Sequence, residues 1–314
     1  MRLVLLAGSA NEKLARRVAS VLGVELANRV SECFPDGERR IEIEESVRGA
    51  DVYVLQPTGP PVADTLLELL LLADACRRAG AARLTAVVSY FGFARQDRRA
   101  RGREPIAARL AADLMATAGF DRIVALDLHD PALEGFMPIP IEHLTATHLL
   151  AEAAKPVVPE HAVVVGPDLG ATKLAERFAT LWGKPVAVVH KLRTSGETVR
   201  AMRVIGDVKG RAPVIVDDMI STAGTVVACA EALREAGCAK PLLVVATHAL
   251  LVGEALERLR MLDVEALFVT DSLAIDVAKT RGLRLRTVSV AKLLATAISK
   301  LHREESMAEM IVHE

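Results

Sequence analysis

The chain has 314 residues, of which 51% are hydrophobic and 25% are charged, a composition that can bury cores for two domains. Thirty-nine Lys and Arg residues against forty Asp and Glu leave a formal net charge of −1, which argues against long-range capture of nucleic acid. No apolar run reaches the roughly 18 residues of a membrane span, because Glu68 interrupts the best candidate, residues 66–72. The four cysteines lack CxxC spacing, which predicts reduced, mostly buried thiols in a cytoplasmic protein. We therefore expect neither nucleic acid nor a membrane as a partner.

Short β-branched runs alternate with longer segments of helical period, which is typical of a parallel sheet covered by helices. In the first half, the pattern predicts strands at 3–7, 51–55, 84–89 and 123–128 and helices at 14–22, 63–79 and 106–118. Gly23, Gly80 and Gly119 follow these helices as C-terminal stops. Residues 40–45 alternate Ile with charged residues, which predicts one strand of a hairpin rather than a central parallel strand.

The second half repeats this pattern. It predicts strands at 162–165, 186–189, 214–216, 242–246 and 266–269 and helices at 171–182, 225–236, 254–262 and 292–302. Two prolines at 138 and 140 mark the boundary, since proline continues neither a helix nor a strand ladder. We expect an α/β fold of two similar domains, 1–142 and 143–314, each a mainly parallel sheet flanked by helices, with the last helix free to pack on either domain.

The strongest chemical signal is an apolar strand that ends in two acids and turns through small residues into a helix, at residues 214–225. Backbone N–H groups at the start of that helix, with the hydroxyls of Thr222 and Thr225, are suited to hold a phosphate. Asp217 and Asp218 are then placed to accept hydrogen bonds from ribose hydroxyls. The alternative is that the paired acids only cap the helix, although capping does not require two acids after a buried strand.

Other segments carry weaker signals. A Phe beside a Pro-Asp-Gly turn at 34–38 is suited to stack on adenine, although the spacing by itself indicates only a turn. Arginines at 95–103 form a basic loop suited to grip a triphosphate, with a solvated charge run or a nucleic-acid patch as alternatives. His129 follows an expected strand, where an open α/β sheet places ligand groups, but a lone His is usually structural. Lys191 and Arg193 open a polar segment with the composition of a flap, or are surface charges.

Residues 214–225 resemble the phosphoribosyl-pyrophosphate loop that type I phosphoribosyltransferases share with ribose-phosphate pyrophosphokinases. This motif alone does not separate the two families. Further segments are similar to pyrophosphokinase motifs and occur in the order of that family: FPDGE at 34–38, EESVRG at 44–49, YFGFARQDR at 90–98, REPI at 103–106, DLH at 127–129 and GPD at 166–168. The resemblance covers nearly the whole chain and implies two phosphoribosyltransferase-like domains.

The resemblance implies transfer of the pyrophosphoryl group of Mg-ATP to the anomeric hydroxyl of ribose 5-phosphate, which yields 5-phosphoribosyl 1-pyrophosphate and AMP. It assigns ATP binding to Phe34, Asp36, Gly37, Glu38, Arg95, Gln96, Asp97 and His129. It assigns ribose 5-phosphate binding to Arg193, Asp217, Asp218, Ser221, Thr222, Ala223, Gly224 and Thr225. Lys191 and Arg193 are implied as catalytic residues, and His129 and Asp168 as the residues associated with Mg²⁺.

The resemblance also implies a homo-oligomer built from dimers, up to a hexamer, because in the family the hairpin that matches residues 34–38 reaches a neighbouring subunit's site. Arg48, Arg101 and Arg103 match a regulatory phosphate or nucleotide site between subunits. Leu192 and Ser221 depart from many bacterial members in the manner of archaeal-type ones, which leaves allosteric control open. Two alternative functions stay open at this point: a phosphoribosyltransferase, and a non-catalytic regulatory subunit of pyrophosphokinase complexes.

Overall fold

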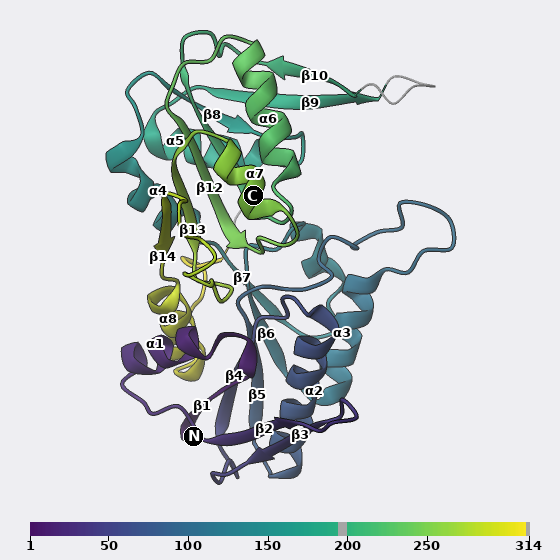
Figure 1. Cartoon of the computed structure of the whole chain (residues 1–314). Helices are drawn as coiled ribbons and strands as arrows, with labels where there is room; N and C mark the ends of the chain where they lie inside the picture. Colours follow the sequence, from purple (N-terminus) through teal and green to yellow (C-terminus); the bar gives the residue numbers. More distant parts are fainter. Residues whose placement is uncertain (194–199, 312–314) are drawn as a thin grey trace. The chain divides into compact units, whose positions relative to one another are not determined.

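The computed structural model describes the backbone of residues 1–193 and 200–311, and the side chains of these residues outside 191–201. This described part divides into two compact units (Figure 1). Unit 1 comprises Met1–Thr145, Ser272–Ala274 and Ser289–Glu314, and unit 2 comprises Ala146–Asp271 and Ile275–Val288. The expected division at residue 142 stays a prediction, and an edge strand of unit 1 runs across that position.

Unit 1 is built on a parallel sheet with the strand order β1-β4-β5-β6-β7. The strands are β1 (Leu3–Ala7), β4 (Asp51–Leu55), β5 (Arg83–Val88), β6 (Arg122–Leu126) and β7 (Ile141–Leu144). Every residue of β4 is buried, which explains why residues 52–55 form a continuous run of Val, Tyr and Leu rather than an alternating pattern after Asp51 at the start of the strand.

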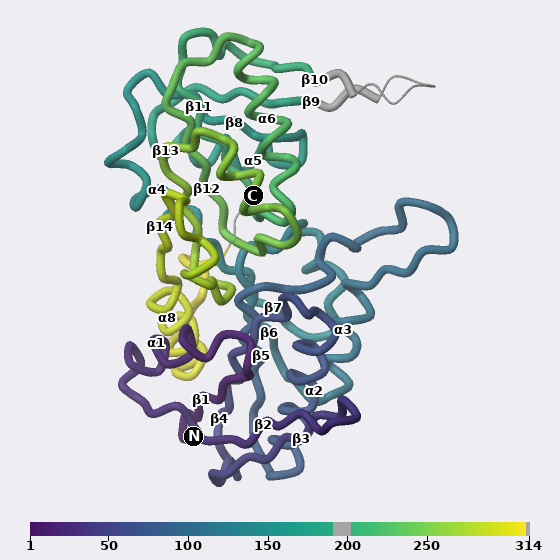
Figure 2. Tube along the Cα trace, in the orientation of Figure 1, coloured from purple at the N-terminus to yellow at the C-terminus, as the bar shows by residue number. Residues whose placement is uncertain are grey.

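Helices cover both faces of this sheet. They are α1 (Glu12–Leu22), α2 (Val62–Arg78), α3 (Ala107–Ala118) and α8 (Ala291–His302). Val52 and Val54 pack in one core with the buried faces of α2 and α3. On the other face α1 packs beside α8, so that an early and a late helix of the chain lie side by side in unit 1 (Figure 2).

A two-stranded hairpin adds to unit 1. Its strands are β2 (Arg29–Cys33) and β3 (Arg39–Ile43), which pair antiparallel. Ile41 and Ile43 of β3 pack against the same core as α2. The expectation of a hairpin strand here is confirmed, because charged residues alternate with Ile along a strand that buries only one face.

Unit 2 holds a larger sheet with the order β10-β9-β8-β11-β12-β13-β14, parallel except for the β10–β9 pair. Its strands are β8 (Ala162–Gly166), β9 (Val186–Arg193), β10 (Arg200–Ile205), β11 (Ala212–Ile220), β12 (Leu242–Ala249), β13 (Val264–Thr270) and β14 (Leu285–Val288). Its helices are α4 (Thr147–Ala154), α5 (Thr172–Trp182), α6 (Gly224–Glu235) and α7 (Ala255–Met261), with short 3-10 turns elsewhere in the chain at Ser9–Asn11, Pro131–Phe136 and Lys155–Val157.

The expected α/β class is confirmed by both sheets. The cysteines are free: Cys76 and Cys229 are buried and Cys238 is partly buried, in line with the expectation of mostly buried thiols, while Cys33 is exposed at the end of β2. Within the described residues, no helix combines the length and the hydropathy needed to cross a membrane.

Candidate active site

Neighbouring parallel strands of unit 2 bring several of the expected site positions to one edge of the sheet. Strand β8 lies between β9 and β11, with Val165 in register with Ala187 on one side and Ile215 on the other. Asp168 follows β8, Lys191 lies near the end of β9, and Asp217 lies near the end of β11. Because parallel strands end at the same edge, these positions share the carboxyl edge, where open α/β sheets bind ligands.

Acidic side chains gather at this edge. The carboxylate of Asp217 accepts a hydrogen bond from the backbone N–H of Asp218 at 2.9 Å. Burial, together with the negative charges of Asp218 and Asp168, raises the pKa of Asp217 well above its ordinary value. The fold therefore holds the carboxylates of Asp168, Asp217 and Asp218 close together despite their mutual repulsion. A bound cation, or hydroxyl groups that donate hydrogen bonds, would stabilise this arrangement.

The loop between β11 and α6 has an unusual backbone conformation. Ala223 precedes the helix with φ 60° and ψ 5°, in the left-handed region that residues with a side chain rarely adopt. The N–H of Val252 donates to the carbonyl of Ser221 at 3.0 Å, which ties the loop to the segment after β12. Helix α6 begins at Gly224, and the first N–H groups of a helix have no carbonyl partner within it. This helix terminus is therefore oriented to receive an anion.

Arg258 braces the same loop, and the sequence analysis missed it. Its guanidinium, on α7, donates to the backbone carbonyl of Thr222 at 3.1 Å and pairs with Glu254 at 2.7 Å. Nothing in the local pattern around residue 258 indicates this contact, because Thr222 lies 36 residues earlier in the chain.

In unit 1, the expected ATP residues outside the hairpin, at 95–97 and at His129, follow the adjacent strands β5 and β6. Asp127, directly after β6, has a φ of 37°, a left-handed conformation that is typical of functional loops. His129 is exposed two residues later. The loop after β5 approaches this segment, since the guanidinium of Arg98 lies 3.9 Å from the carboxylate of Asp130. Arg95 and Gln96 are exposed on that loop.

His143 is a second residue that the sequence analysis missed. The N–H of Leu128 donates to its Nε2 at 2.8 Å, so Nδ1 carries the proton and donates to Glu134 at 2.8 Å. The ring is buried on β7, directly beneath the segment that carries His129. His143 therefore fixes the backbone that presents His129.

The hairpin tip at 34–38 is closed by its own backbone. The N–H of Phe34 donates to the carbonyl of Glu38 at 2.7 Å, and the carboxylate of Asp36 accepts from the N–H of Glu38 at 3.0 Å. Gly37 has a φ of 94°, which permits the tight turn. The side chain of Phe34 is 44% exposed, so the ring is available for stacking.

The structure brings together Asp168, Asp217 and Asp218 with the loop 221–225 in unit 2, and the 95–98 segment with the His129 segment in unit 1. Lys191 and Arg193 are placed on β9 by their backbone, while their side chains and the flap residues 194–197 lie outside the described residues. Among described side chains, no group of three or more His, Cys, Asp or Glu residues is arranged to hold a metal ion.

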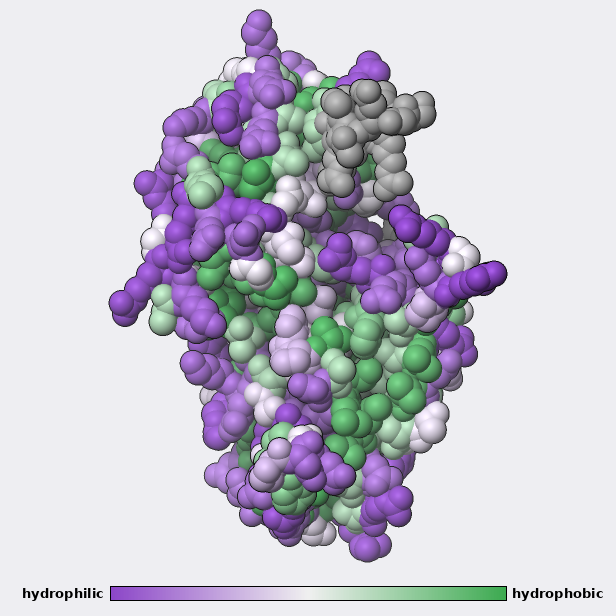
Figure 3. Space-filling view, turned by 45° about the vertical axis from the view of Figure 1, so that its right-hand side comes forward, coloured by the Kyte–Doolittle hydropathy of each residue, from purple (hydrophilic) through white to green (hydrophobic). Residues whose placement is uncertain are grey.

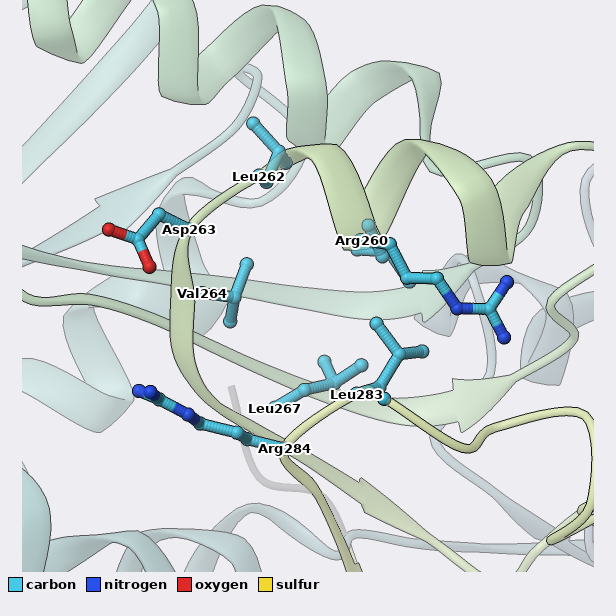
Figure 4. A pocket seen from close by; sticks show the side chains of 9 residues that line it. Arg260, Leu262, Asp263, Val264, Leu267, Leu283 and Arg284 are labelled. Carbon is cyan, nitrogen blue, oxygen red and sulfur yellow. The ribbon is translucent and has the colours of Figure 1, made fainter.

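A pocket of about 190 Å³ lies elsewhere in unit 2, between the end of α7 and the starts of β13 and β14 (Figure 4). Apolar side chains, mostly leucines, line it together with the charged residues Arg260, Asp263 and Arg284. These charges have partners of their own, such as Lys240 for Asp263. The pocket lies at the amino ends of the strands, opposite to the edge that carries the expected site.

Comparison with known proteins places the whole chain in one family. Residues 3–119 match the N-terminal domain of ribose phosphate pyrophosphokinase, and residues 193–312 match the phosphoribosyl synthetase-associated domain. The chain is 44% identical to a ribose-phosphate pyrophosphokinase of Staphylococcus saprophyticus over 301 residues, which are 95% of this chain and 93% of the relative. A ribose-phosphate pyrophosphokinase of Staphylococcus aureus is 43% identical over the same shares of both chains.

The crystal structure of phosphoribosylpyrophosphate synthetase from Mycobacterium smegmatis is similar throughout, with a TM-score of 0.91 and 40% sequence identity. The similarity covers 97% of this chain and 100% of the mycobacterial one. The order of motifs, the sheets and these similarities agree, and the chain is an enzyme that belongs to the ribose-phosphate pyrophosphokinase family.

Proposed function

We propose that the chain transfers the β,γ-pyrophosphoryl group of Mg-ATP to the anomeric hydroxyl of ribose 5-phosphate. The bond between the α,β-bridging oxygen and the β-phosphorus breaks, and a bond from the sugar oxygen to that phosphorus forms. AMP leaves, the hydroxyl proton is released, and the product is 5-phosphoribosyl 1-pyrophosphate. The observation that carries this proposal is the alignment of Asp168, Lys191 and Asp217 at one edge of one sheet, beside the N-terminus of α6.

Unit 2 is proposed to bind ribose 5-phosphate. The N–H groups and hydroxyls of the loop from Ser221 to Thr225 hold the 5-phosphate at the helix terminus, and Asp217 and Asp218 accept hydrogen bonds from the ribose hydroxyls. Lys191 and Arg193 stabilise the charge that develops on the transferred group. Catalysis here is mostly positioning and charge stabilisation, as in other phosphoryl transfers.

Unit 1 is proposed to bind ATP. Phe34 stacks on adenine, while Asp36, Gly37 and Glu38 complete the pocket at the hairpin tip. Arg95, Gln96 and Asp97 contact the nucleotide from the loop after β5, and His129 reaches its phosphates.

Mg²⁺ is proposed as the cofactor. Asp168 and Asp218, whose charges raise the pKa of Asp217, offer carboxylate oxygens, the ligand atoms that Mg²⁺ prefers. Mg²⁺ usually keeps several waters and binds substrate phosphates, so it needs few protein ligands, and the described side chains offer no larger cluster. Asp168 and His129 are proposed as the residues associated with the ion. When bound, it neutralises negative charge on the transferred group.

A dimer-based homo-oligomer, up to a hexamer, is proposed as the assembly, in a cytoplasmic location. The exposed ring of Phe34 suits a hairpin that completes its site with another copy. Hydrophobic side chains also gather on the face of unit 1 that α2 and α3 form (Figure 3), where Leu67, Leu110 and Leu114 are exposed. Such a face is typical of a surface covered by a partner.

The test is an assay that quantifies AMP and phosphoribosyl pyrophosphate from ATP, with and without ribose 5-phosphate, at several concentrations of Mg²⁺ and of inorganic phosphate. We expect the two products in equal amounts, only when the sugar phosphate is present. Omission of the metal, checked with a chelator, should abolish turnover. A phosphoribosyltransferase would instead consume phosphoribosyl pyrophosphate with a nucleobase, and folded protein that forms no AMP would contradict the proposal.

Asp217→Asn tests the acidic edge of the sheet. The raised pKa of Asp217 means that folding disfavours the ionised carboxylate. Near pH 7.5 the neutral amide of Asn removes this penalty, so the melting temperature of the ligand-free protein should rise by about 2–4 °C. The same change should raise KM for ribose 5-phosphate about tenfold, because an acceptor for the ribose hydroxyls is weakened. Thermal unfolding and initial rates measure both effects. Unchanged affinity for the sugar phosphate would remove Asp217 from the binding site.

A further inference from the structure

A buried carboxylate in α2 is not used by the mechanism above. Glu68 interrupts the apolar run of this helix, and its side chain is 0% exposed. Burial of a carboxylate is strongly unfavourable unless hydrogen bonds and a positive charge compensate for the lost water. Its partners therefore indicate why the helix keeps a charge at this position.

Both carboxylate oxygens of Glu68 are bound by donors from distant parts of unit 1. Oε1 accepts from the N–H of Ser9 at 3.0 Å and from the hydroxyl of Ser31 at 2.9 Å, and lies 3.4 Å from the guanidinium of Arg39. Oε2 accepts from the hydroxyl of Ser9 at 2.5 Å and from Nε2 of Gln56 at 2.9 Å. The carboxylate thus links the loop after β1 and the end of β4 to the hairpin.

The hairpin contributes to this network from both strands. In its register, Ser31 lies opposite Ile41 and Cys33 lies opposite Arg39, so these side chains share the face that looks toward α2. Near its base, this face is held by Ile41 and Ile43 in the apolar core. Ser31, at the level of Ile41, and Arg39, nearer the tip, add polar bonds. Both bind Glu68, and Arg39 also donates to Ser31 at 3.1 Å.

On the opposite face of the hairpin, the ion pairs within the described part of the chain stay inside the hairpin: Arg40 pairs with Glu32 at 3.3 Å and with Glu42. The tip begins one residue after Cys33 and ends one residue before Arg39. Glu68 therefore holds the hairpin close to where the exposed tip starts.

We infer that Glu68 is a positioning residue for ATP: through Ser31 and Arg39 it fixes the angle at which the hairpin presents Phe34 and Asp36 to the nucleotide. This inference rests on the proposed function, in which the hairpin tip binds ATP. It predicts an effect that is specific for ATP, because Glu68 has no described contact with unit 2, where the sugar phosphate is proposed to bind.

The kinetic test uses Glu68→Gln in the full chain, which keeps the shape but places an amide N–H₂ among donors. We expect KM for ATP to rise about tenfold, with kcat and KM for ribose 5-phosphate within about twofold of the parent enzyme. Ser31→Ala removes one hairpin donor and leaves the other partners of Glu68, so KM for ATP should rise about threefold. Phe34→Ala serves as the positive control for the tip itself.

Asp51→Asn is the matched control for a carboxylate-to-amide change. Asp51 is also 0% exposed, but it lies at the opposite end of β4 and binds Arg83 and His302 rather than the hairpin. The Asp51→Asn variant should have a lower melting temperature than the parent enzyme, but its KM for ATP should not change selectively. If the role of Glu68 were purely structural, Glu68→Gln would also lower thermal stability without a selective rise in KM for ATP, as Asp51→Asn does.

A second readout does not depend on activity. Cys33 is exposed at the root of the tip, while Cys76 and Cys229 are buried and burial raises the pKa of Cys76 to about 12. In a Cys238→Ser background, a nitroxide on Cys33 reports the motion of the hairpin by electron paramagnetic resonance. We expect a more mobile spectrum in Glu68→Gln than in the parent and in Asp51→Asn.

The outcomes separate the two levels of the proposal. Increased mobility with a raised KM for ATP supports the inference. An unchanged spectrum, or increased mobility with an unchanged KM while Phe34→Ala raises it, overturns the positioning role of Glu68. If Phe34→Ala leaves KM for ATP unchanged, the assignment of ATP to the hairpin is wrong, and the positioning role fails with it.

Discussion

Lys191→Ala is expected to lower kcat by on the order of 10²-fold or more while the protein stays folded. The backbone of β9 places Lys191 at the carboxyl edge of the sheet, on the strand next to the one that Asp168 follows. In the proposed role, the cation of Lys191 stabilises the charge of the transferred pyrophosphoryl group in the transition state more than in the bound substrates, so its loss is expected to reduce kcat rather than affinity. Steady-state rates at saturating ATP and ribose 5-phosphate measure the effect.

Lys184→Ala is the control for the loss of a lysine in unit 2. Its ammonium donates to the backbone carbonyl of Glu160 at 2.8 Å on the surface, before β9 begins. This variant should retain near-parental kcat. A folded Lys191→Ala protein that also turns over at the parental rate would remove Lys191 from the catalytic role.

Arg83→Met is expected to lower the free energy of unfolding by about 3–5 kcal/mol, because it leaves a buried carboxylate without its main partner. The guanidinium of Arg83 binds both oxygens of Asp51 at 2.8 and 2.6 Å, and Asp51 has 0% exposure. Tyr53 and His302 also contact this carboxylate, at 3.1 and 2.7 Å. Denaturant unfolding of the parent and the variant measures the difference.

Arg78→Met provides the comparison with an exposed ion pair. Arg78 contacts Asp74 at 2.7 Å on α2, yet its side chain is 80% exposed, so its loss should leave the unfolding midpoint within experimental error. If Arg83→Met and Arg78→Met changed the free energy of unfolding equally, burial of Asp51 would not determine how much stability is lost with its partner.

The pH dependence of the Asp51 cluster has a defined sign. Burial by itself raises the pKa of Asp51, but hydrogen bonds from Arg83 and His302 outweigh it, so the pKa lies below its ordinary value of 3.8. The cluster therefore stabilises the fold above that value, and the contribution is lost as the pH falls through the lowered pKa.

Secondary structure was largely predictable from sequence where burial is complete. Strands β4 and β8 are buried along their whole length, and their sequences are correspondingly continuous apolar runs, apart from Asp51 at the start of β4. The elements that the pattern missed include α4 and the sheet-edge strands β7, β10 and β14. An edge strand such as β14 is short and includes charged Arg286, and it is defined by pairing with β13 rather than by its own pattern.

The proposed phosphate loop could be located from sequence because its features are contiguous: the acids, the small residues and the helix start follow one another within residues 214–225. The alignment of Asp168, Lys191 and Asp217 required the strand order, which places β8 between β9 and β11. Sequence indicated each residue, and the sheet determined that they share an edge.

The residues that hold the site in place were not predictable, because their partners are distant in sequence. Glu68 binds Ser9 across 59 residues, Arg258 binds the carbonyl of Thr222 across 36, and His143 binds Leu128 across 15. In the sequence, a buried charged side chain or histidine ring is only an interruption of an apolar pattern, because its hydrogen-bond partners are not visible there. The sequence by itself determined the α/β class and the family, and it supplied the residues that we propose for the chemistry. Only the tertiary structure decided which buried polar groups orient them, since hydrogen bonds depend on distance and direction in space and not on separation along the chain.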